Sequence, residues 1–234
     1  FVFKVYYDRA TNDVTFDENG HGSAPAKQSA IRYGAQVADP GNLSEVGWTF
    51  GGWYTDAACT DAAKWNFTTD TTPNNPLTLY AKWTQNTYTV SDDMNDTDSA
   101  SKASPASIAD RTDVHWNGAG LVSTTPTRAG YTFAGWVVKG ETSKKVGSTT
   151  AYSTLVADDQ VSGVTLQATW TENANVTLSY VSSDTSKGTV TPARDSVAPA
   201  TGNATGATAT AKTGYHFVNW TNSSNSTKTT DATL

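Results

Sequence analysis

One short motif occurs three times in this 234-residue chain. It consists of a glycine, an aromatic residue, any residue, a phenylalanine, two further residues and a tryptophan. The three copies end at Trp53, Trp136 and Trp220, at nearly constant intervals. An interval of this size is the signature of a repeat architecture. The chain is therefore expected to consist of successive copies of one structural module, since a catalytic site is rarely written three times.

A second repeated segment follows the first two motif copies. It reads LTLYAKW at 77–83 and VTLQATW at 164–170, and both copies alternate apolar and polar residues, which predicts a half-buried strand. Further strands are predicted upstream of the motifs, at 12–20, 86–93 and 175–183. These patterns predict three modules, which we call repeat one (1–84), repeat two (85–172, with an acidic Ser/Asp-rich insertion) and repeat three (173–234). Repeat three is expected to be divergent and C-terminally incomplete, because it lacks the strand that ends in tryptophan.

The aromatic residues of the motif are the predicted core. Strict strand alternation would place Phe133 and Trp136 on opposite faces, which predicts a strand covered on both sides. A buried Trp or Phe removes about 150–250 Å² from water, so a few such side chains can support a small β-rich unit. Trp53, Trp136 and Trp220 are therefore predicted to be buried. The alternative is an exposed aromatic platform on which sugars stack.

The motifs of repeat one also carry a family resemblance. VTFDENGHG, IRYGAQVADP, GWTFGGWYTDAAC, KWNF and LTLYAKW follow one another in this order, and the segment resembles the internalin B-repeat, also called the Listeria–Bacteroides repeat. Repeat two is similar over its second half. Repeat three, with KGTVTP, GATATAKTGYHFVNW and STKTTDATL, resembles the divergent form of the same repeat.

The resemblance implies a small β-grasp-like fold and tandem arrays in bacterial surface proteins, often between an adhesive tip and a cell-wall anchor. It brings no catalytic residues with it. The predicted fold class is accordingly β-rich α+β, with tandem small β-grasp-like units arranged end to end. The junctions at 84–86 and 171–175 are short and are not the Gly/Ser-rich or Pro-rich linkers that let domains tumble freely.

Charge and hydropathy exclude several kinds of partner. The formal net charge is −6, and the 16 Lys and Arg residues are scattered rather than gathered in a stripe, which argues against nucleic acid and against anionic lipid. No run of 18 apolar residues occurs, so no membrane span is predicted. The chain opens with FVFKVYY, which reads as part of a strand. We therefore expect a piece of a longer protein, with its signals and anchors outside this segment.

Catalytic chemistry is not indicated. His21, His115 and His216 fall in different repeats at no ligand spacing, and no Ser-His-Asp set stands in a recognisable context. The chain is predicted not to be an enzyme and to need no cofactor. The single cysteine, Cys59, excludes an internal disulfide and is expected to be a buried small residue rather than a reactive thiol, since its neighbours are acidic.

The insertion in repeat two holds a cluster of oxygen-bearing side chains. Its members are Asp92, Asp93, Asn95, Asp96 and Asp98. Calcium prefers such ligands, although the spacing does not fit the twelve-residue helix–loop–helix pattern. A calcium site and a solvated acidic insertion are both open. Lys82, Lys139 and Lys212, in or near predicted strands, raise the further question of a Lys–Asn isopeptide bond.

These observations favour a non-catalytic structural spacer, or stalk, in an adhesin-type surface protein of a Gram-positive bacterium. The expected location is extracellular, on the cell wall, with anchoring through regions outside this segment. The alternative is an adhesive module that binds a host glycan or protein through exposed aromatic residues or through the insertion, because loops on rigid scaffolds often carry function. A monomer is expected in either case.

Overall fold

The computed structural model describes residues 1–99, 101–122, 124–224 and 226–234. The chain divides into two compact units. One unit comprises Phe1–Val90, Arg111–Leu121 and Ser148–Val164, and the other comprises Ser91–Asp110, Val122–Gly147 and Thr165–Leu234. The division passes through repeat two, so each unit contains the residues on both sides of one junction between predicted repeats.

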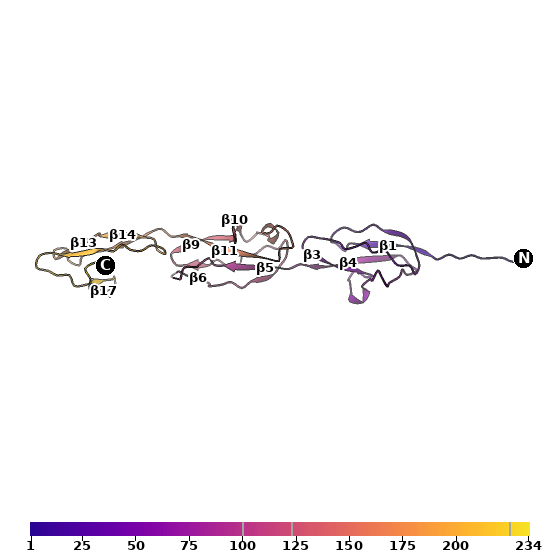
Figure 1. Ribbon diagram of the computed structural model, residues 1–234, viewed down its shortest axis with the longest axis horizontal. Coiled ribbons are helices and arrows are strands. Elements are labelled where there is room, and N and C mark those ends of the chain that lie inside the picture. The colour runs from indigo at the N-terminus through magenta and orange to yellow at the C-terminus, as the bar shows by residue number, and fades with distance from the viewer. Residues whose placement is uncertain (100, 123, 225) are drawn as a thin grey trace. The chain divides into compact units, whose positions relative to one another are not determined.

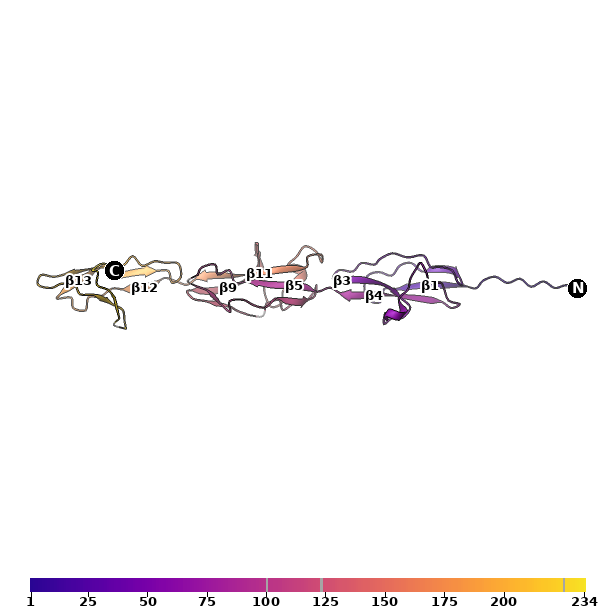
Figure 2. The same ribbon diagram turned by 60° about the horizontal axis from the view of Figure 1, so that its bottom comes forward.

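Repeat one forms a four-stranded mixed sheet (Figure 1). Its strands are β1 (Thr11–Asp17), β2 (Gln28–Arg32), β3 (Trp48–Tyr54) and β4 (Leu77–Gln85), in the order β2-β1-β4-β3. The two central strands, β1 and β4, are parallel, whereas β1 pairs with β2 and β3 pairs with β4 in antiparallel fashion. Figure 2 shows β3 and β4 lying side by side. Val14, Leu79 and Ala81 from the central strands are fully buried.

Repeat two forms a larger sheet. Its strands are β5 (Tyr88–Asp93), β6 (Ala103–Ser104), β7 (Arg111–Val114), β8 (Thr127–Arg128), β9 (Tyr131–Val138), β10 (Glu141–Val146) and β11 (Gly163–Glu172). The strand order is β6-β8-β9-β11-β5-β7, and β10 pairs with β9 off this path. β5 and β11 lie at the strands predicted at 86–93 and 164–170, and they correspond to β1 and β4 of repeat one.

Repeat three consists of three antiparallel pairs. Its strands are β12 (Val176–Ser179), β13 (Gly188–Thr191), β14 (Arg194–Val197), β15 (Thr208–Ala211), β16 (Trp220–Thr221) and β17 (Thr227–Thr229). β12 pairs with β14, β13 with β15 and β16 with β17. The motif does not form a full strand here, because among the described residues it has no equivalent of β4 or β11 to pair with.

The prediction of a β-rich fold is confirmed. Helical structure among the described residues is limited to two 3-10 helices, η1 (Asp61–Ala63) and η2 (Tyr152–Thr154). The helical component is thus smaller than an α+β description implies, since no segment places apolar residues at helical spacing. Phe1–Ala10 forms no strand, and the side chains of Phe1 and Tyr7 are exposed.

The repeated motif is built around a β-bulge. In repeat one, Phe50 lies opposite Trp83 and Trp53 lies opposite Ala81, so the motif strand carries one extra residue. Repeat two has the same shift, with Phe133 opposite Trp170 and Trp136 opposite Ala168. A bulge of this kind sets two residues against one and bends the strand.

The bulge corrects the prediction that Phe133 and Trp136 occupy opposite faces. Their ring centroids are 5.6 Å apart in an edge-to-face arrangement. The corresponding rings of Phe50 and Trp53 are also 5.6 Å apart, and those of Phe217 and Trp220 are 5.8 Å apart. Strict alternation fails because the extra residue turns the tryptophan back to the side of the phenylalanine. The three-residue spacing therefore gives one aromatic pair on one face.

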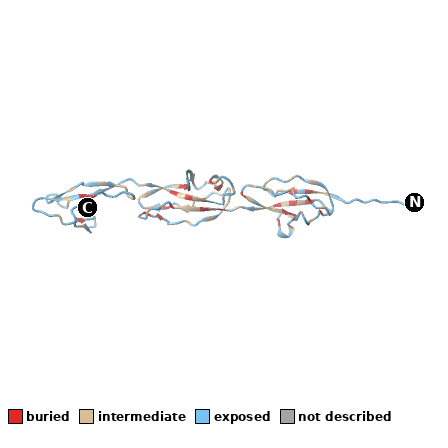
Figure 3. Cartoon of the chain, viewed as in Figure 1, coloured by how far each residue is buried: buried red, intermediate tan, exposed pale blue. Residues whose placement is uncertain are grey.

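The three motif tryptophans are buried, as predicted. Trp53 is 2% exposed, Trp136 is 3% exposed and Trp220 is 8% exposed. In repeats one and two a third aromatic ring, Trp83 or Trp170, packs against the phenylalanine at 5.4 or 5.5 Å. Figure 3 shows that buried residues are concentrated on the strands. These tryptophans are core residues, and the platform alternative does not apply to them.

Candidate functional site

The histidines lie in separate surroundings. The His21 ring lies 3.8 Å from that of Trp48, centroid to centroid. His115 Nδ1 is 3.2 Å from the carbonyl oxygen of Asn86, and His216 is exposed. Within the described part of the chain, no three His, Cys, Asp or Glu side chains are grouped so that they could hold a metal ion.

Two residues of the acidic cluster belong to a turn that repeat one also has. The Asp93 carboxylate accepts a hydrogen bond from the Asn95 backbone N–H at 2.8 Å, and Asn95 Nδ2 donates to the Ala168 carbonyl at 3.1 Å. The same bonds in repeat one run from Asn19 N to Asp17 at 2.8 Å and from Asn19 Nδ2 to Ala81 at 3.1 Å. Asn19 and Asn95 both have positive φ, 53° and 49°. Both turns therefore fasten the end of one central strand to the neighbouring strand.

The remaining contacts of the cluster are also internal. Lys139 Nζ lies 2.8 Å from Asp93 Oδ2, and this hydrogen bond is the main reason why the Asp93 pKa is lowered. Asp96 Oδ2 accepts the Ala103 N–H at 2.7 Å. Asp92 and Asp98 also make interactions. The calcium site stays a prediction, and the fold already gives Asp93 and Asp96 protein partners.

The three lysines considered for isopeptide bonds have different neighbours. Lys82 Nζ is 3.3 Å from Asp61, an exposed carboxylate, and Lys139 pairs with Asp93 as described. Lys212 Nζ donates to the Thr185 carbonyl at 2.9 Å. These are ordinary ion pairs and a hydrogen bond to the backbone.

Cys59 is a buried free thiol. Its Sγ lies 3.6 Å from the Ala81 carbonyl oxygen. Burial raises the Cys59 pKa, and the negative charge of Asp56 adds to the effect. The prediction that Cys59 is buried is confirmed. A raised pKa disfavours the nucleophilic thiolate, in line with the expected low reactivity.

In repeats one and two, the second residue of the motif is an aromatic ring that the chain itself covers. In repeat one the His21 imidazole lies over Trp48, with Trp83 at 6.0 Å. In repeat two the Arg128 guanidinium lies 4.1 Å above the Tyr131 ring and 5.9 Å from the Trp170 ring. The contacts of Arg128 are cation–π interactions, which stabilise the fold. They also occupy one face of rings that would otherwise be open to a ligand.

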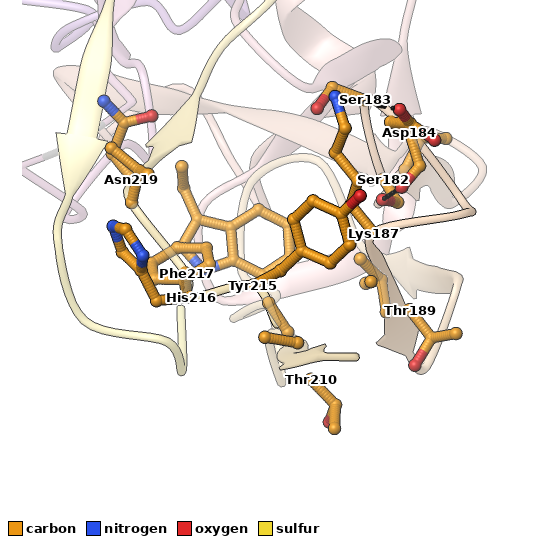
Figure 4. A pocket seen from close by; sticks show the side chains of 17 residues that line it. Ser182, Ser183, Asp184, Lys187, Thr189, Thr210, Tyr215, His216, Phe217 and Asn219 are labelled. Atoms are coloured by element: carbon orange, nitrogen blue, oxygen red, sulfur yellow. Dashed lines mark hydrogen bonds and ion pairs between the residues drawn. The ribbon is translucent and has the colours of Figure 1, made fainter. Parts of the chain in front are cut away.

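Repeat three differs, because its motif lines a hollow of about 280 Å³. Tyr215, which is 51% exposed, contributes to the wall together with Phe217 and Trp220. Figure 4 shows the polar groups of Ser183 and Asp184 at one end of the hollow and His216 toward the other. The Asp184 pKa is lowered to about 2, mainly by the hydrogen bond from the Ser186 hydroxyl. An exposed aromatic ring beside fixed polar groups is the kind of surface that carbohydrates bind.

The sequence did not single out this hollow. Its lining comes from separate segments of the chain, at 181–184, 187–190, 209–211 and 215–220, so no local pattern marks it. Val218 is 65% exposed.

The fold defines a protein of tandem β-rich repeats with an aromatic core in each. Comparison with known families agrees. Residues 13–82 and 88–191 match the Listeria-Bacteroides repeat domain, and residues 177–234 match the divergent InlB B-repeat domain. The chain therefore belongs to the Listeria–Bacteroides repeat family, as its motifs predicted.

Individual relatives are much longer than the matched segment. Internalin H of Listeria monocytogenes is 30% identical over 164 residues, which cover 69% of this chain and 25% of that protein. A putative membrane protein of Evansella cellulosilytica is 36% identical over 132 residues, which cover 56% of this chain and 19% of that protein. The chain thus spans a quarter or less of the length of these relatives. In the described residues, no helix is both long enough and apolar enough to cross a membrane.

Proposed function

We propose that this chain is a non-catalytic structural spacer within a bacterial surface protein of the adhesin type. The observation that carries the proposal is the use of the repeated aromatic residues. Each motif tryptophan is buried against a phenylalanine, and His21 and Arg128 cover the rings of Trp48 and Tyr131. Repeating the same buried aromatic core three times makes the chain longer and adds no reactive site.

The setting follows from the family and its relatives. The relatives include internalin H and two proteins named as putative membrane proteins, and these names support a setting at the cell surface. An extracellular location on a Gram-positive cell wall, with anchoring outside this segment, is part of the proposal. The proposal also states that the chain has no enzymatic activity, makes no contact with nucleic acid or membrane, and is a monomer.

The proposed organisation is three β-grasp-like repeats at 1–84, 85–172 and 173–234. The sheet of repeat one supports the fold, since its order β2-β1-β4-β3 with parallel central strands is the arrangement of a β-grasp sheet. The short junctions support an end-to-end arrangement.

Small-angle X-ray scattering of the monomer tests the spacer. Three units of about 80 residues placed end to end would give a radius of gyration of about 27 Å, whereas one compact domain of this length would give about 17–18 Å. We expect the larger value. A radius near the smaller value would reject the spacer proposal.

The hollow in repeat three favours a second candidate function, the binding of a glycan. Tyr215 supplies an exposed ring, and Ser183, Asp184 and His216 supply polar groups around it. Stacking on aromatic rings with nearby hydrogen-bonding groups is a usual means of orienting a polar ligand. Glycan-array binding that Tyr215→Ala abolishes would support this function. Tyr33→Ala is the matched control, because Tyr33 is also 51% exposed and lies outside the hollow.

The insertion of repeat two is a further candidate surface for a host protein. Part of it is structural, because β6 and β7 belong to the sheet of repeat two. Deleting 92–113 would therefore remove strands together with any binding surface. Point substitutions on its exposed residues, such as Asp110→Ala, are the sharper test, and unchanged binding of a host-cell extract across them would reject this surface.

A further inference from the structure

The two junctions between predicted repeats are held by equivalent hydrogen bonds between a glycine, a threonine and an asparagine. At the first junction the Asn86 N–H donates to the Gly47 carbonyl at 2.9 Å, and Thr49 Oγ1 donates to Asn86 Oδ1 at 2.6 Å. At the second, the Asn173 N–H donates to the Gly130 carbonyl at 2.9 Å, and Thr132 Oγ1 donates to Asn173 Oδ1 at 2.6 Å.

The glycine that opens each of the first two motif copies is also in close contact with the following repeat. Gly47 and Gly130 have φ values of +81° and +78°. A Cβ added to Gly47 would lie 2.7 Å from Trp116 Cβ, and a Cβ added to Gly130 would lie 2.8 Å from Ala200 Cβ. Real side chains do not approach so closely. Both glycines thus provide the space that a residue of the following repeat occupies.

A carboxylate closes each junction. At the first junction, Asp159 of repeat two accepts the Gly47 N–H at 2.9 Å, and this bond is the main cause of the lowered Asp159 pKa. At the second, Glu172 of repeat two accepts the N–H groups of Ala200 at 2.9 Å and Thr201 at 2.8 Å, and the Thr201 hydroxyl at 2.7 Å. Hydrogen bonds to an ionised acceptor are stronger than neutral ones.

We propose that the turn at the motif glycine is a docking surface whose partner is the following repeat. The glycine admits a residue of that repeat, the Thr–Asn pair fixes the connecting strand, and a carboxylate bonds to backbone N–H groups across the junction. Each junction lies within one compact unit of the chain. The inference rests on the proposed repeat organisation, but not on the spacer role.

Gly214 provides the internal control. It opens the third motif copy and has a φ of +87°, yet a Cβ added there would meet nothing within 4 Å in the described structure. Gly130→Ala and Gly214→Ala therefore impose similar backbone strain, but only Gly130→Ala would place a methyl group against the neighbouring repeat.

Amide hydrogen exchange of the whole chain, measured by NMR, tests the proposal. In Gly130→Ala the Ala200 and Thr201 amides should exchange roughly 10- to 100-fold faster, as expected for loss of hydrogen bonds to a charged group. Gly214→Ala should leave the exchange of these two amides unchanged. The Ala168 amide, on the strand β11, reports whether repeat two has stayed folded.

Glu172→Gln is the second variant, because it removes the charge without adding volume. It should also accelerate exchange at Ala200 and Thr201 while the amides of β13 keep their protection. Unchanged exchange at both amides in Glu172→Gln and Gly130→Ala would overturn the docking surface. So would equal acceleration in Gly214→Ala. The radius of gyration from X-ray scattering is a separate measurement. Failure of the docking-surface proposal can therefore be distinguished from failure of the spacer proposal.

Discussion

At the residue scale, the motif tryptophans are buried side chains of the core. Trp136 is 3% exposed, contacts the Phe133 ring and donates from Nε1 to the Thr124 carbonyl at 3.3 Å. Removing the indole would leave a cavity beside Phe133 and would remove this hydrogen bond. Both effects act on a repeat whose size allows only a thin core.

We expect Trp136→Ala to lower the free energy of unfolding of repeat two by about 3–5 kcal/mol. Urea denaturation monitored by circular dichroism measures the loss. Val218→Ala is the control, because Val218 is 65% exposed and its loss should change stability by no more than about 0.5 kcal/mol. A loss below about 1 kcal/mol in Trp136→Ala would show that the ring is not a core element.

Asp184 gives a pH-dependent prediction at the same scale. The Ser186 hydroxyl and Lys187 stabilise its ionised form and lower its pKa from 3.8 to about 2. Because the folded-state pKa is lowered, the stabilisation is present above the unfolded value and is lost as the pH falls from about 4 toward 2. NMR titration of the carboxyl carbon should show that Ser186→Ala raises this pKa. Titration of wild-type Asp184 near 4 would contradict the hydrogen-bonding scheme.

At the scale of strands and turns, only some features of the fold could be predicted from the sequence. Alternation in 77–83 and 164–170 predicted β4 and β11, and the repeated tryptophans predicted the core. The bulge was not predicted, because strict alternation was assumed for the motif, although the three-residue spacing of Phe133 and Trp136 is the phase shift that a bulge produces. Two further features were not predicted, namely the turns at Asn19 and Asn95 and the junction contacts of Gly47 and Gly130. In both cases the partner residues lie far away in the chain. The hollow in repeat three was not predicted either, because it is lined by separate segments of the chain.

The bulge itself can be tested at Gly135. Its φ is +124°, and a Cβ there would meet nothing within 4 Å, so a substitution acts on the backbone alone. Gly135→Ala should cost about 1–3 kcal/mol, since L-residues rarely adopt this conformation. Denaturation of the variant measures the cost, and Ala134→Ser, at an exposed neighbour, is the control. Equal stability of both variants would argue against a bulge at this position.

The acidic insertion allows a test of calcium binding. Asp93 is paired with Lys139, and Asp96 is bonded to the Ala103 N–H. A calcium ion would have to displace or share these partners. We therefore expect calorimetric titration to millimolar calcium to give no saturable heat. Saturable heat that Asp96→Asn abolishes would instead establish the calcium site.

At the scale of the whole molecule, the repeats differ in the size of their cores. Repeat one buries the cluster Val14, Phe16, Val37, Trp53, Trp65, Leu77, Leu79 and Ala81. The corresponding cluster of repeat three consists of Tyr180, Ala207 and Trp220. In tandem arrays, stability is approximately the sum of the stability of each repeat and the contacts with its neighbours. Repeat three, with the smaller of these two clusters, therefore depends more on its neighbour than repeat one does, through the bonds of Glu172.

We expect repeat three to unfold first on heating, in a transition separate from those of repeats one and two. Residue-resolved NMR during a thermal ramp would show signals of β13 and β15 disappearing before those of β1 and β4. Glu172→Gln should lower the temperature of this first transition, because it weakens the bonds to Ala200 and Thr201, and should leave the unfolding of repeat one unchanged. Val218→Ala, at an exposed position, should shift neither. One transition common to all three repeats would mean that the junctions couple them more strongly than their cores differ.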